Sequence, residues 1–172
     1  MRQLWAPWRL EYIQGAKSGA CFLCAAAAGG DDEAALVVHR APHSFVILNR
    51  FPYNAGHVMV APAVHRARIA DLDDETALEM VRLVDRTIEV MDAVLHADGY
   101  NVGINLGRAA GAGVEDHVHV HVVPRWAGDT NFMPVLGDAK VMPEHLQATR
   151  RRLAQGYAAP AASRSFPRAE PQ

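Results

Sequence analysis

The segment at residues 117–123, HVHVHVV, limits most strongly what this chain can fold into. It places three of the nine histidines at every second position, with a valine between each pair. Successive side chains of a β-strand point to opposite faces of the sheet, so the histidines are expected to share one face while the valines enter a hydrophobic core. The segment therefore predicts a strand that presents a row of imidazoles.

Neutral imidazole can act near neutral pH as a nucleophile, a general acid–base or a metal ligand. The row is therefore open to three interpretations: tolerated histidines on a half-exposed sheet, a metal site like the His-x-His motifs of all-β metalloenzymes, or nucleophilic attack on phosphorus. A metal site of that kind needs several more strands, a nearby carboxylate and no long central helix. The sequence offers little of this, so we favour attack on phosphorus.

The rest of the chain predicts an α+β fold, an antiparallel sheet with one long helix and a shorter C-terminal helix packed on it. The expected elements are strands at 36–40, 44–50, 56–62, 100–107 and 117–123, and helices at 73–96 and 143–156. The early strands are short, alternating and separated by turn residues, which favours antiparallel neighbours. The long helix shows apolar residues at three- and four-residue steps, opens with acidic residues and closes at Gly99.

Length and composition bound the organisation and the class of protein. At 172 residues the chain is about one domain long, which we place at residues 1–156, with an N-terminal aromatic arm and a disordered tail at 157–172. The formal charge of −2 gives no support to a nucleic-acid binder. No apolar run is long enough for a membrane span, and the N-terminus lacks the apolar core of a signal peptide. We therefore expect a cytoplasmic protein that binds neither nucleic acid nor membrane.

Several motifs resemble the histidine triad (HIT) superfamily. HVHVHVV resembles its His-x-His-x-His-x-x signature, VILNRFPYNAGHVMVAP its strand–turn–strand segment, and NVGINLG its nucleotide-contacting strand. LWAPWRLEYI and HVVPRWAGDTNFMP are similar to the bacterial diadenosine tetraphosphate phosphorylase (ATP adenylyltransferase) branch of that superfamily. The resemblance covers roughly residues 4–156.

The resemblance implies roles for individual residues. His119 would attack the α-phosphorus of a nucleotide and form a covalent nucleotidyl-histidine, which replaces one difficult displacement by two easier ones. His121 would donate a hydrogen bond to a nonbridging phosphate oxygen, and His117 would support the strand from the edge of the site. Asn49 matches a ribose-binding position, and Asn105 matches a position near the α-phosphate; the alternative for either is a turn or strand-edge cap.

The glycine-rich loop before the histidines departs from the family pattern. Its backbone N–H groups, including that of Gly113, could form a nest for the phosphate. Many members carry a Gly-Gln pair here, whereas this chain has Ala112 and Gly113. A glutamine contact to the leaving group is therefore not expected.

Cys21 and Cys24 are the only cysteines, so disulfides cannot form a framework. Their spacing suits half of a tetrahedral zinc site, but free or buried thiols and a redox pair remain alternatives. The resemblance implies that His65 and His117 complete a structural Cys2His2 zinc site. The remaining histidines show no partner pattern and are expected to be ordinary surface or satisfied histidines, with His57 supporting its turn: His39, His43, His57, His96 and His145.

The implied activity is phosphorolysis of a dinucleoside polyphosphate, such as diadenosine tetraphosphate, to ADP and ATP, with phosphate as co-substrate and a homodimer or higher homo-oligomer as the assembly. One alternative is a hydrolase of the same fold that acts on dinucleoside polyphosphates or nucleoside phosphoramidates. Another is a nucleotide-binding regulatory module with little turnover. A metal-dependent enzyme that uses the histidine row as ligands is the last alternative.

Overall fold

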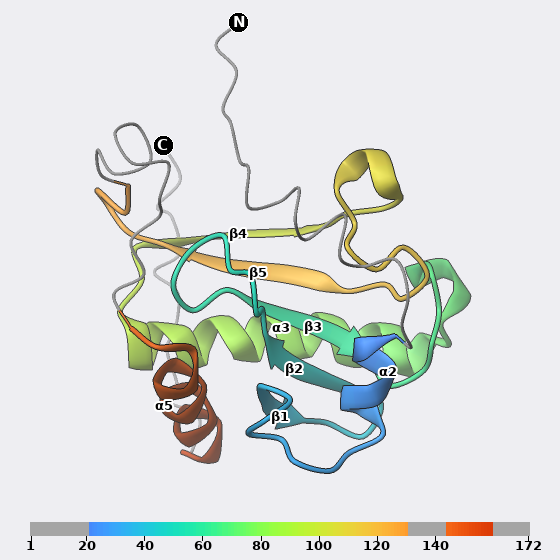
Figure 1. The fold of residues 1–172 in the computed structure, drawn as a ribbon, viewed down its shortest axis with the longest axis horizontal. Coiled ribbons are helices and arrows are strands. Elements are labelled where there is room, and N and C mark those ends of the chain that lie inside the picture. Colours follow the sequence, from blue (N-terminus) through green and yellow to red (C-terminus); the bar gives the residue numbers. More distant parts are fainter. Residues whose placement is uncertain (1–20, 131–143, 160–172) are drawn as a thin grey trace, which may run out of the picture.

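The computed structural model describes residues 21–130 and 144–159, which form a five-stranded sheet flanked by helices (Figure 1). The strands are β1 (Val37–Arg40), β2 (Ser44–Leu48), β3 (Val58–Pro62), β4 (Gly99–Ile104) and β5 (Val120–Arg125), and the helices are α2 (Phe22–Ala27), α3 (Asp74–Leu95) and α5 (Leu146–Ala158), with short 3-10 turns at Ile69–Asp71 and Arg108–Ala110. The strand order is β1-β2-β3-β5-β4, and every neighbouring pair is antiparallel. This confirms the predicted α+β fold.

Helix α3 lies against the sheet and contacts β2, β3 and β5 (Figure 1). Its start is fixed by Asp73, whose side chain accepts a hydrogen bond from the Thr76 N–H at 2.8 Å and satisfies one of the unpaired donors of the first turn. Its end is His96, which adopts a left-handed conformation with φ of 52°. The helix therefore matches the predicted range of 73–96 closely.

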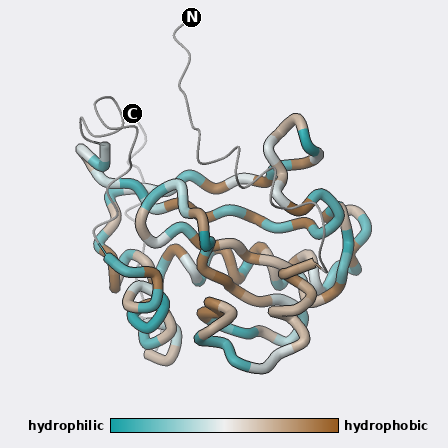
Figure 2. Tube along the Cα trace, viewed as in Figure 1, coloured by the Kyte–Doolittle hydropathy of each residue, from teal (hydrophilic) through white to brown (hydrophobic). Residues whose placement is uncertain are grey.

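The sheet core and the helices exclude water from one row of β5 side chains. Val118, just before β5, and Val120 and Val122 within it are buried, as the alternation predicted. Figure 2 shows both hydrophobic and hydrophilic positions along β5. Val120 and Val122 join a core that includes Phe45 and Met91. The triad histidines are also buried, so the tolerated, half-exposed sheet face is the wrong interpretation of this row.

Strand β5 begins at Val120, three residues later than the predicted 117. The pairing of β3 with β5 ends at Val60 and Val120, close to Pro62, which has no N–H to continue the ladder. The N–H of Val118 instead donates to the carbonyl of Arg66 at 2.6 Å. His117 and His119 therefore lie in the segment that leads into the strand.

Helix α5 runs to Ala158, two residues past its predicted end and inside the region expected to be a disordered tail. Tyr157 explains the difference, because its ring stacks on His39 with centroids 4.3 Å apart and its hydroxyl hydrogen-bonds Thr87. These contacts hold the last turn against β1 and α3. The N-terminal arm and residues 160–172 of the tail lie outside the described residues.

Candidate active site and metal cluster

His119 and His121 form the centre of the site, with ring centroids 4.9 Å apart. His121 pairs across the sheet with Met59 of β3 and with Gly103 of β4, so it lies between two strands. Only 5% of His119 and 8% of His121 is exposed to solvent. Two imidazoles are therefore held side by side in a site that is largely screened from water.

The protonation of His119 follows from its hydrogen bond. Its Nδ1 lies 2.8 Å from the carbonyl oxygen of His117, and a carbonyl can only accept, so Nδ1 carries the proton. In the neutral ring, Nε2 is then left with an unshared electron pair. Burial lowers the pKa of His119, which favours this neutral form. Nε2 is the nitrogen able to attack an electrophile.

His121 is oriented from the other side by His57. The Nδ1 of His57 accepts the N–H of Tyr53 at 3.0 Å, so the proton of the neutral ring lies on Nε2. That Nε2 lies 2.9 Å from Nδ1 of His121 and donates to it. The remaining nitrogen of His121, Nε2, is therefore a donor, which suits a phosphate oxygen that gains negative charge.

His57 is a satisfied histidine that supports its turn, as expected, and the structure adds a contact that was not predicted. It is fully buried and contacts His121 although 64 residues separate the two along the chain. It also supports the turn before β3, as expected, through its bond with Tyr53. One sequence signal could have found it: His57 directly precedes the apolar run VMVAP, where an unpaired polar residue is costly.

The turn that precedes and positions His57 depends on Asn49 and Gly56. Asn49 Oδ1 accepts the N–H of Phe51 at 2.9 Å, and its Nδ2 lies 3.3 Å from Nδ1 of His57. Gly56 has a φ of +77°, and a Cβ there would lie 2.6 Å from Cδ1 of Leu95, so only glycine fits. Asn49 therefore makes the turn contact that was the alternative to ribose binding, and it also contacts His57.

Asn105 and Gly113 are the two other residues predicted on the phosphate side of the site, and only Asn105 is described in contact with a triad histidine. Nδ2 of Asn105 lies 3.3 Å from Nε2 of His121. Rotation of the amide by 180° about its Cβ–Cγ bond exchanges nitrogen and oxygen, and the oxygen can then accept the Nε2–H of His121. Gly113 lies in the loop between the turn at Arg108–Ala110 and His117. This loop is shaped by Gly111, with φ of 84°, and by the Ala112 N–H, which donates to Gly107 at 3.3 Å.

Cys21, Cys24, His65 and His117 form a second centre. Their ligand atoms, the two Sγ and two Nδ1, all lie within 4.8 Å of one another. Nδ1 of His117 lies 3.4 Å from Sγ of Cys21 and 3.5 Å from that of Cys24, while Nδ1 of His65 lies 3.1 Å from Cys24 Sγ. All four predicted metal ligands are therefore brought together.

These distances fit a tetrahedral zinc ion. Zn–S bonds of about 2.3 Å and Zn–N bonds of about 2.0–2.1 Å place neighbouring sulfur and nitrogen ligands roughly 3.6 Å apart. The Nε2 of His117 lies 2.9 Å from the carbonyl oxygen of Pro62 and donates to it, so Nδ1 has the electron pair that a metal requires. The donor set and the ring orientation both suit zinc.

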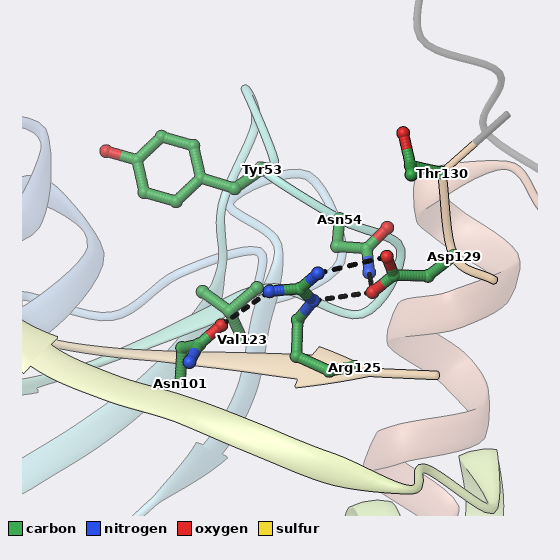
Figure 3. Close-up of a pocket in the computed structure, with 7 residues that line it drawn as sticks. All are labelled: Tyr53, Asn54, Asn101, Val123, Arg125, Asp129 and Thr130. Carbon is green, nitrogen blue, oxygen red and sulfur yellow. Dashed lines mark hydrogen bonds and ion pairs between the residues drawn. The ribbon is translucent and has the colours of Figure 1, made fainter. Parts of the chain in front are cut away.

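A cleft of about 310 Å³ lies at the end of the sheet where Asn101 of β4 and Arg125 of β5 meet (Figure 3). Its lining residues are Tyr53, Asn54, Asn101, Val123, Arg125, Asp129 and Thr130. Tyr53 connects it to the centre, because its ring stacks on His57 with centroids 4.6 Å apart. Arg125 is paired with Asp129 and donates to Asn101 at 2.8 Å, so the cleft is polar without a strong net charge.

No helix in the described part of the chain has the length and apolar character needed to cross a membrane.

Comparisons with known proteins agree with this geometry. The AP-4-A phosphorylase of Mycobacterium tuberculosis is 38% identical over 166 residues, which cover 92% of this chain and 85% of that protein. The asymmetrical bis(5'-nucleosyl)-tetraphosphatase of Schizosaccharomyces pombe is 34% identical over 93 residues, 54% of this chain and 50% of that protein. The first relative therefore extends over almost the whole chain, and the second over about half.

Solved structures share the fold. A zinc-bound histidine triad family protein from Mycobacterium smegmatis superposes with a TM-score of 0.65 at 28% identity, covering 81% of this chain and 94% of that one. The family model of the HIT domain matches residues 32–128, more than half of the chain and a span that includes the triad. The chain belongs to the HIT domain family.

Proposed function

We propose that the protein transfers a nucleotidyl group from a dinucleoside polyphosphate, such as diadenosine tetraphosphate, through a nucleotidyl-histidine at His119. The observation that carries the proposal is the tautomer of His119, whose Nδ1–H is held by a main-chain carbonyl and whose Nε2 is the available nucleophile. The 38% identity to a protein named AP-4-A phosphorylase supports the choice of substrate.

The reaction has two displacements at phosphorus. Nε2 of His119 forms a bond to the α-phosphorus of diadenosine tetraphosphate, and the bond to the bridging oxygen breaks, so ATP leaves and an adenylyl group stays on the ring. Inorganic phosphate then attacks the same phosphorus, the phosphorus–nitrogen bond breaks, and ADP leaves. His121 donates its Nε2–H to a nonbridging oxygen in both steps and stabilises the charge that develops there.

The surrounding residues have supporting roles in this proposal. Asn49 binds the ribose of the nucleotide that becomes attached, and Asn105 lies near the α-phosphate. The N–H of Gly113 contributes to a phosphate-binding loop. We place a nucleoside of the substrate in the cleft lined by Tyr53 and Asn101, because its aromatic ring and uncharged amides suit a base or a ribose.

A hydrolase is the second candidate, because the similar protein from Schizosaccharomyces pombe is named a tetraphosphatase. Water would then replace phosphate as the acceptor and release AMP. The two reactions share the first displacement and differ only in what attacks the adenylyl-histidine.

We also propose that zinc binds Cys21, Cys24, His65 and His117 in a structural role. When bound, it would join α2 to the sheet and hold His117, whose carbonyl orients the nucleophile. Two free thiols that serve as ligands suit the reducing cytoplasm. We propose a homodimer as the assembly, since β4 is an edge strand with exposed residues at 101–103.

Product analysis tests the proposal. The purified protein is incubated with diadenosine tetraphosphate with and without phosphate, and the reaction is quenched in base during turnover with substrate labelled at the α-phosphorus. Phosphate-dependent formation of ADP and ATP, with label on the His119 peptide, is expected. ATP and AMP without phosphate indicate the hydrolase instead. Label on another residue, or no products, contradicts a nucleotidyl-histidine at His119.

A further inference from the structure

We propose that Arg40 is a positioning residue for the metal cluster, acting by holding the short helix that carries the cysteine pair. The inference rests on the zinc proposed above and assigns a role to a side chain that contacts no ligand atom. Cys21 is the N-cap of α2 and Cys24 lies inside it, yet this helix has only 6 residues. So short a helix does not hold its shape alone and needs contacts from the rest of the molecule.

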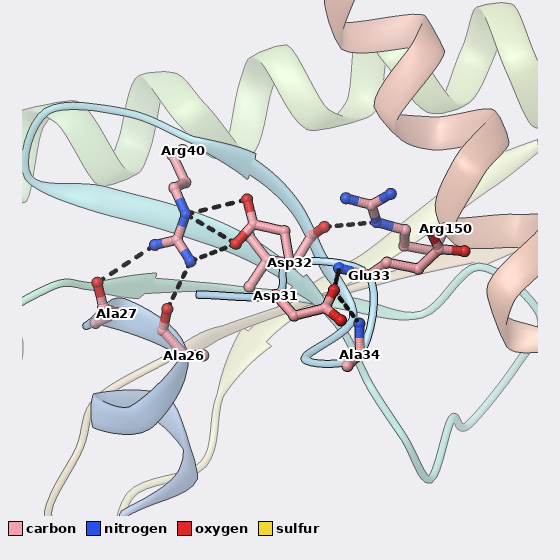
Figure 4. Close-up of polar contacts among 9 residues, drawn as sticks. Ala26, Ala27, Asp31, Asp32, Glu33, Ala34, Arg40 and Arg150 are labelled. Carbon is pink, nitrogen blue, oxygen red and sulfur yellow. Dashed lines mark hydrogen bonds and ion pairs between the residues drawn. The ribbon is translucent and has the colours of Figure 1, made fainter. Parts of the chain in front are cut away.

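The guanidinium of Arg40 supplies those contacts at the end of the helix (Figure 4). Its Nη2 donates to the carbonyl of Ala26 at 2.7 Å and its Nη1 to that of Ala27 at 3.3 Å. Carbonyls in the last turn of a helix have no partner within it, and this end also attracts positive charge. Arg40 therefore caps the C-terminal end of α2, beginning two residues after Cys24.

Asp32 fixes the guanidinium in this orientation. Nε of Arg40 donates to both Asp32 oxygens, at 3.1 and 3.2 Å, and Nη2 donates to Oδ1 at 2.6 Å. Arginine presents donors in a planar fork, so one side chain can hold a carboxylate and two carbonyls in a fixed geometry. Lysine could not reproduce this set of contacts.

The loop that carries Asp32 is in turn attached to α5. Gln147 donates to the carbonyl of Glu33 at 3.0 Å, and Arg151 forms an ion pair with the Glu33 carboxylate at 3.1 Å. Arg150 donates to the carbonyl of Val37 at 2.8 Å (Figure 4). Arg40 thus connects the cysteine helix to a loop that is held by the body of the fold.

This arrangement matters more for the metal than for global stability. The Arg40 and Asp32 side chains are 34% and 38% exposed, and ion pairs of that exposure contribute little to folding. Metal ligands, however, must hold their distances to within about 0.2 Å, and groups that orient them typically change metal affinity by about 10–100-fold. Loss of Arg40 should therefore loosen zinc while the sheet remains folded.

The test compares zinc release from the full-length, zinc-loaded protein and its variants into excess chromogenic chelator. Arg40→Met should release zinc at least about 10-fold faster than the wild type. Arg152→Met is the matched control, because Arg152 also bridges a carboxylate, Glu144, and a carbonyl, that of Val94, away from the cluster. It should release zinc at the wild-type rate. The visible spectrum of the cobalt-substituted protein should broaden in Arg40→Met alone.

A second variant keeps the test decisive if Arg40→Met does not fold. Asp32→Asn retains Arg40 but weakens its anchor, and it should accelerate zinc release to a smaller extent. The inference is overturned if every variant of Arg40 or Asp32 that folds releases zinc at the wild-type rate. It is also overturned if Arg152→Met accelerates release to the same extent. A wild-type protein that takes up no zinc overturns the zinc proposal itself. Neither result affects the proposed nucleotidyl transfer, which is measured by its products.

Discussion

His119 and His117 are two residues apart on one extended segment, yet the structure prepares them for different chemistry. In His119 the main chain holds Nδ1–H and leaves Nε2 available, whereas in His117 the main chain holds Nε2–H and leaves Nδ1 available. The acceptors are the carbonyls of His117 and Pro62, respectively. One ring is thus prepared for attack on phosphorus and the other for a metal, and the difference comes from which carbonyl each ring meets.

The two centres are linked through one residue. The side chain of His117 belongs to the metal cluster, while its carbonyl fixes the tautomer of the nucleophile. Damage to the histidine pair should stop chemistry without affecting the metal. Substitution of a cluster ligand should release the metal and lower the rate of the reaction indirectly. Substitutions in the two centres and in the cleft test this difference, from the largest expected effect to the smallest.

Replacement of His119 with alanine should lower kcat by at least about 10⁴-fold, because it removes the atom that bonds to phosphorus. Zinc content and nucleotide affinity should remain at wild-type levels. Single-turnover kinetics, metal analysis and calorimetric titration with a nucleotide measure the three quantities. Retained turnover would remove His119 from the chemistry, and loss of zinc would show that the two centres are not separable in this direction.

Replacement of Cys24 with serine should abolish stoichiometric zinc binding and lower the thermal midpoint of the protein, because one thiolate ligand is lost. The expected fall in kcat is about 10-fold, since only the orientation of His117 and its carbonyl is disturbed. Metal analysis, thermal unfolding and initial rates measure these effects. A fall in kcat as large as that of His119→Ala would mean that the metal takes part in the reaction.

Replacement of His57 with alanine should lower kcat/KM by roughly 10–100-fold, which corresponds to the loss of one buried hydrogen bond worth about 1–3 kcal/mol. Without His57, the Nδ1 of His121 loses the N–H donor that favours the tautomer in which His121 donates from Nε2. Glutamine at this position should restore part of the activity, because its amide can both donate and accept. His43→Ala is the matched control, since the His43 side chain is 41% exposed and pairs with Glu75. An equal loss there would contradict the role of His57.

Replacement of Asn101 with alanine should give the smallest effect, a rise in KM of about 5-fold with little change in kcat, since it removes one hydrogen-bonding group from the cleft. Val102→Ala changes the neighbouring position, which is not among the cleft-lining residues, and should leave KM unchanged. Steady-state kinetics with diadenosine tetraphosphate measure both variants. A KM that changes equally in both would place the substrate nucleoside outside the cleft.

Much of the fold could be predicted from local pattern. The alternation of histidine and valine predicted a strand with a buried valine face, and the apolar period of residues 73–96 predicted α3 nearly to its ends. The four metal ligands were predicted through the family resemblance, and the structure brings their ligand atoms within 4.8 Å. The position of β5 was less accurate, because Pro62 on the partner strand affects where the ladder ends.

The contact between His57 and His121 shows why part of the site could not be predicted. Its contact with His121 joins residues 64 positions apart, and it depends on the pairing of β3 with β5 and on the turn closed at Gly56. No spacing rule within a segment reports such a contact. The aromatic contact of Tyr157 that extends α5 is of the same kind.

By itself, the sequence determined which side chains are available and how they alternate along each element, since periodicity is a property of neighbouring residues. Only the tertiary structure decided which nitrogen of each imidazole carries the proton and which distant side chains share a site. A hydrogen bond to a carbonyl or to another ring requires partners brought together by strand pairing, and these partners, not the motif, divide the histidine row between a nucleophile and a metal ligand.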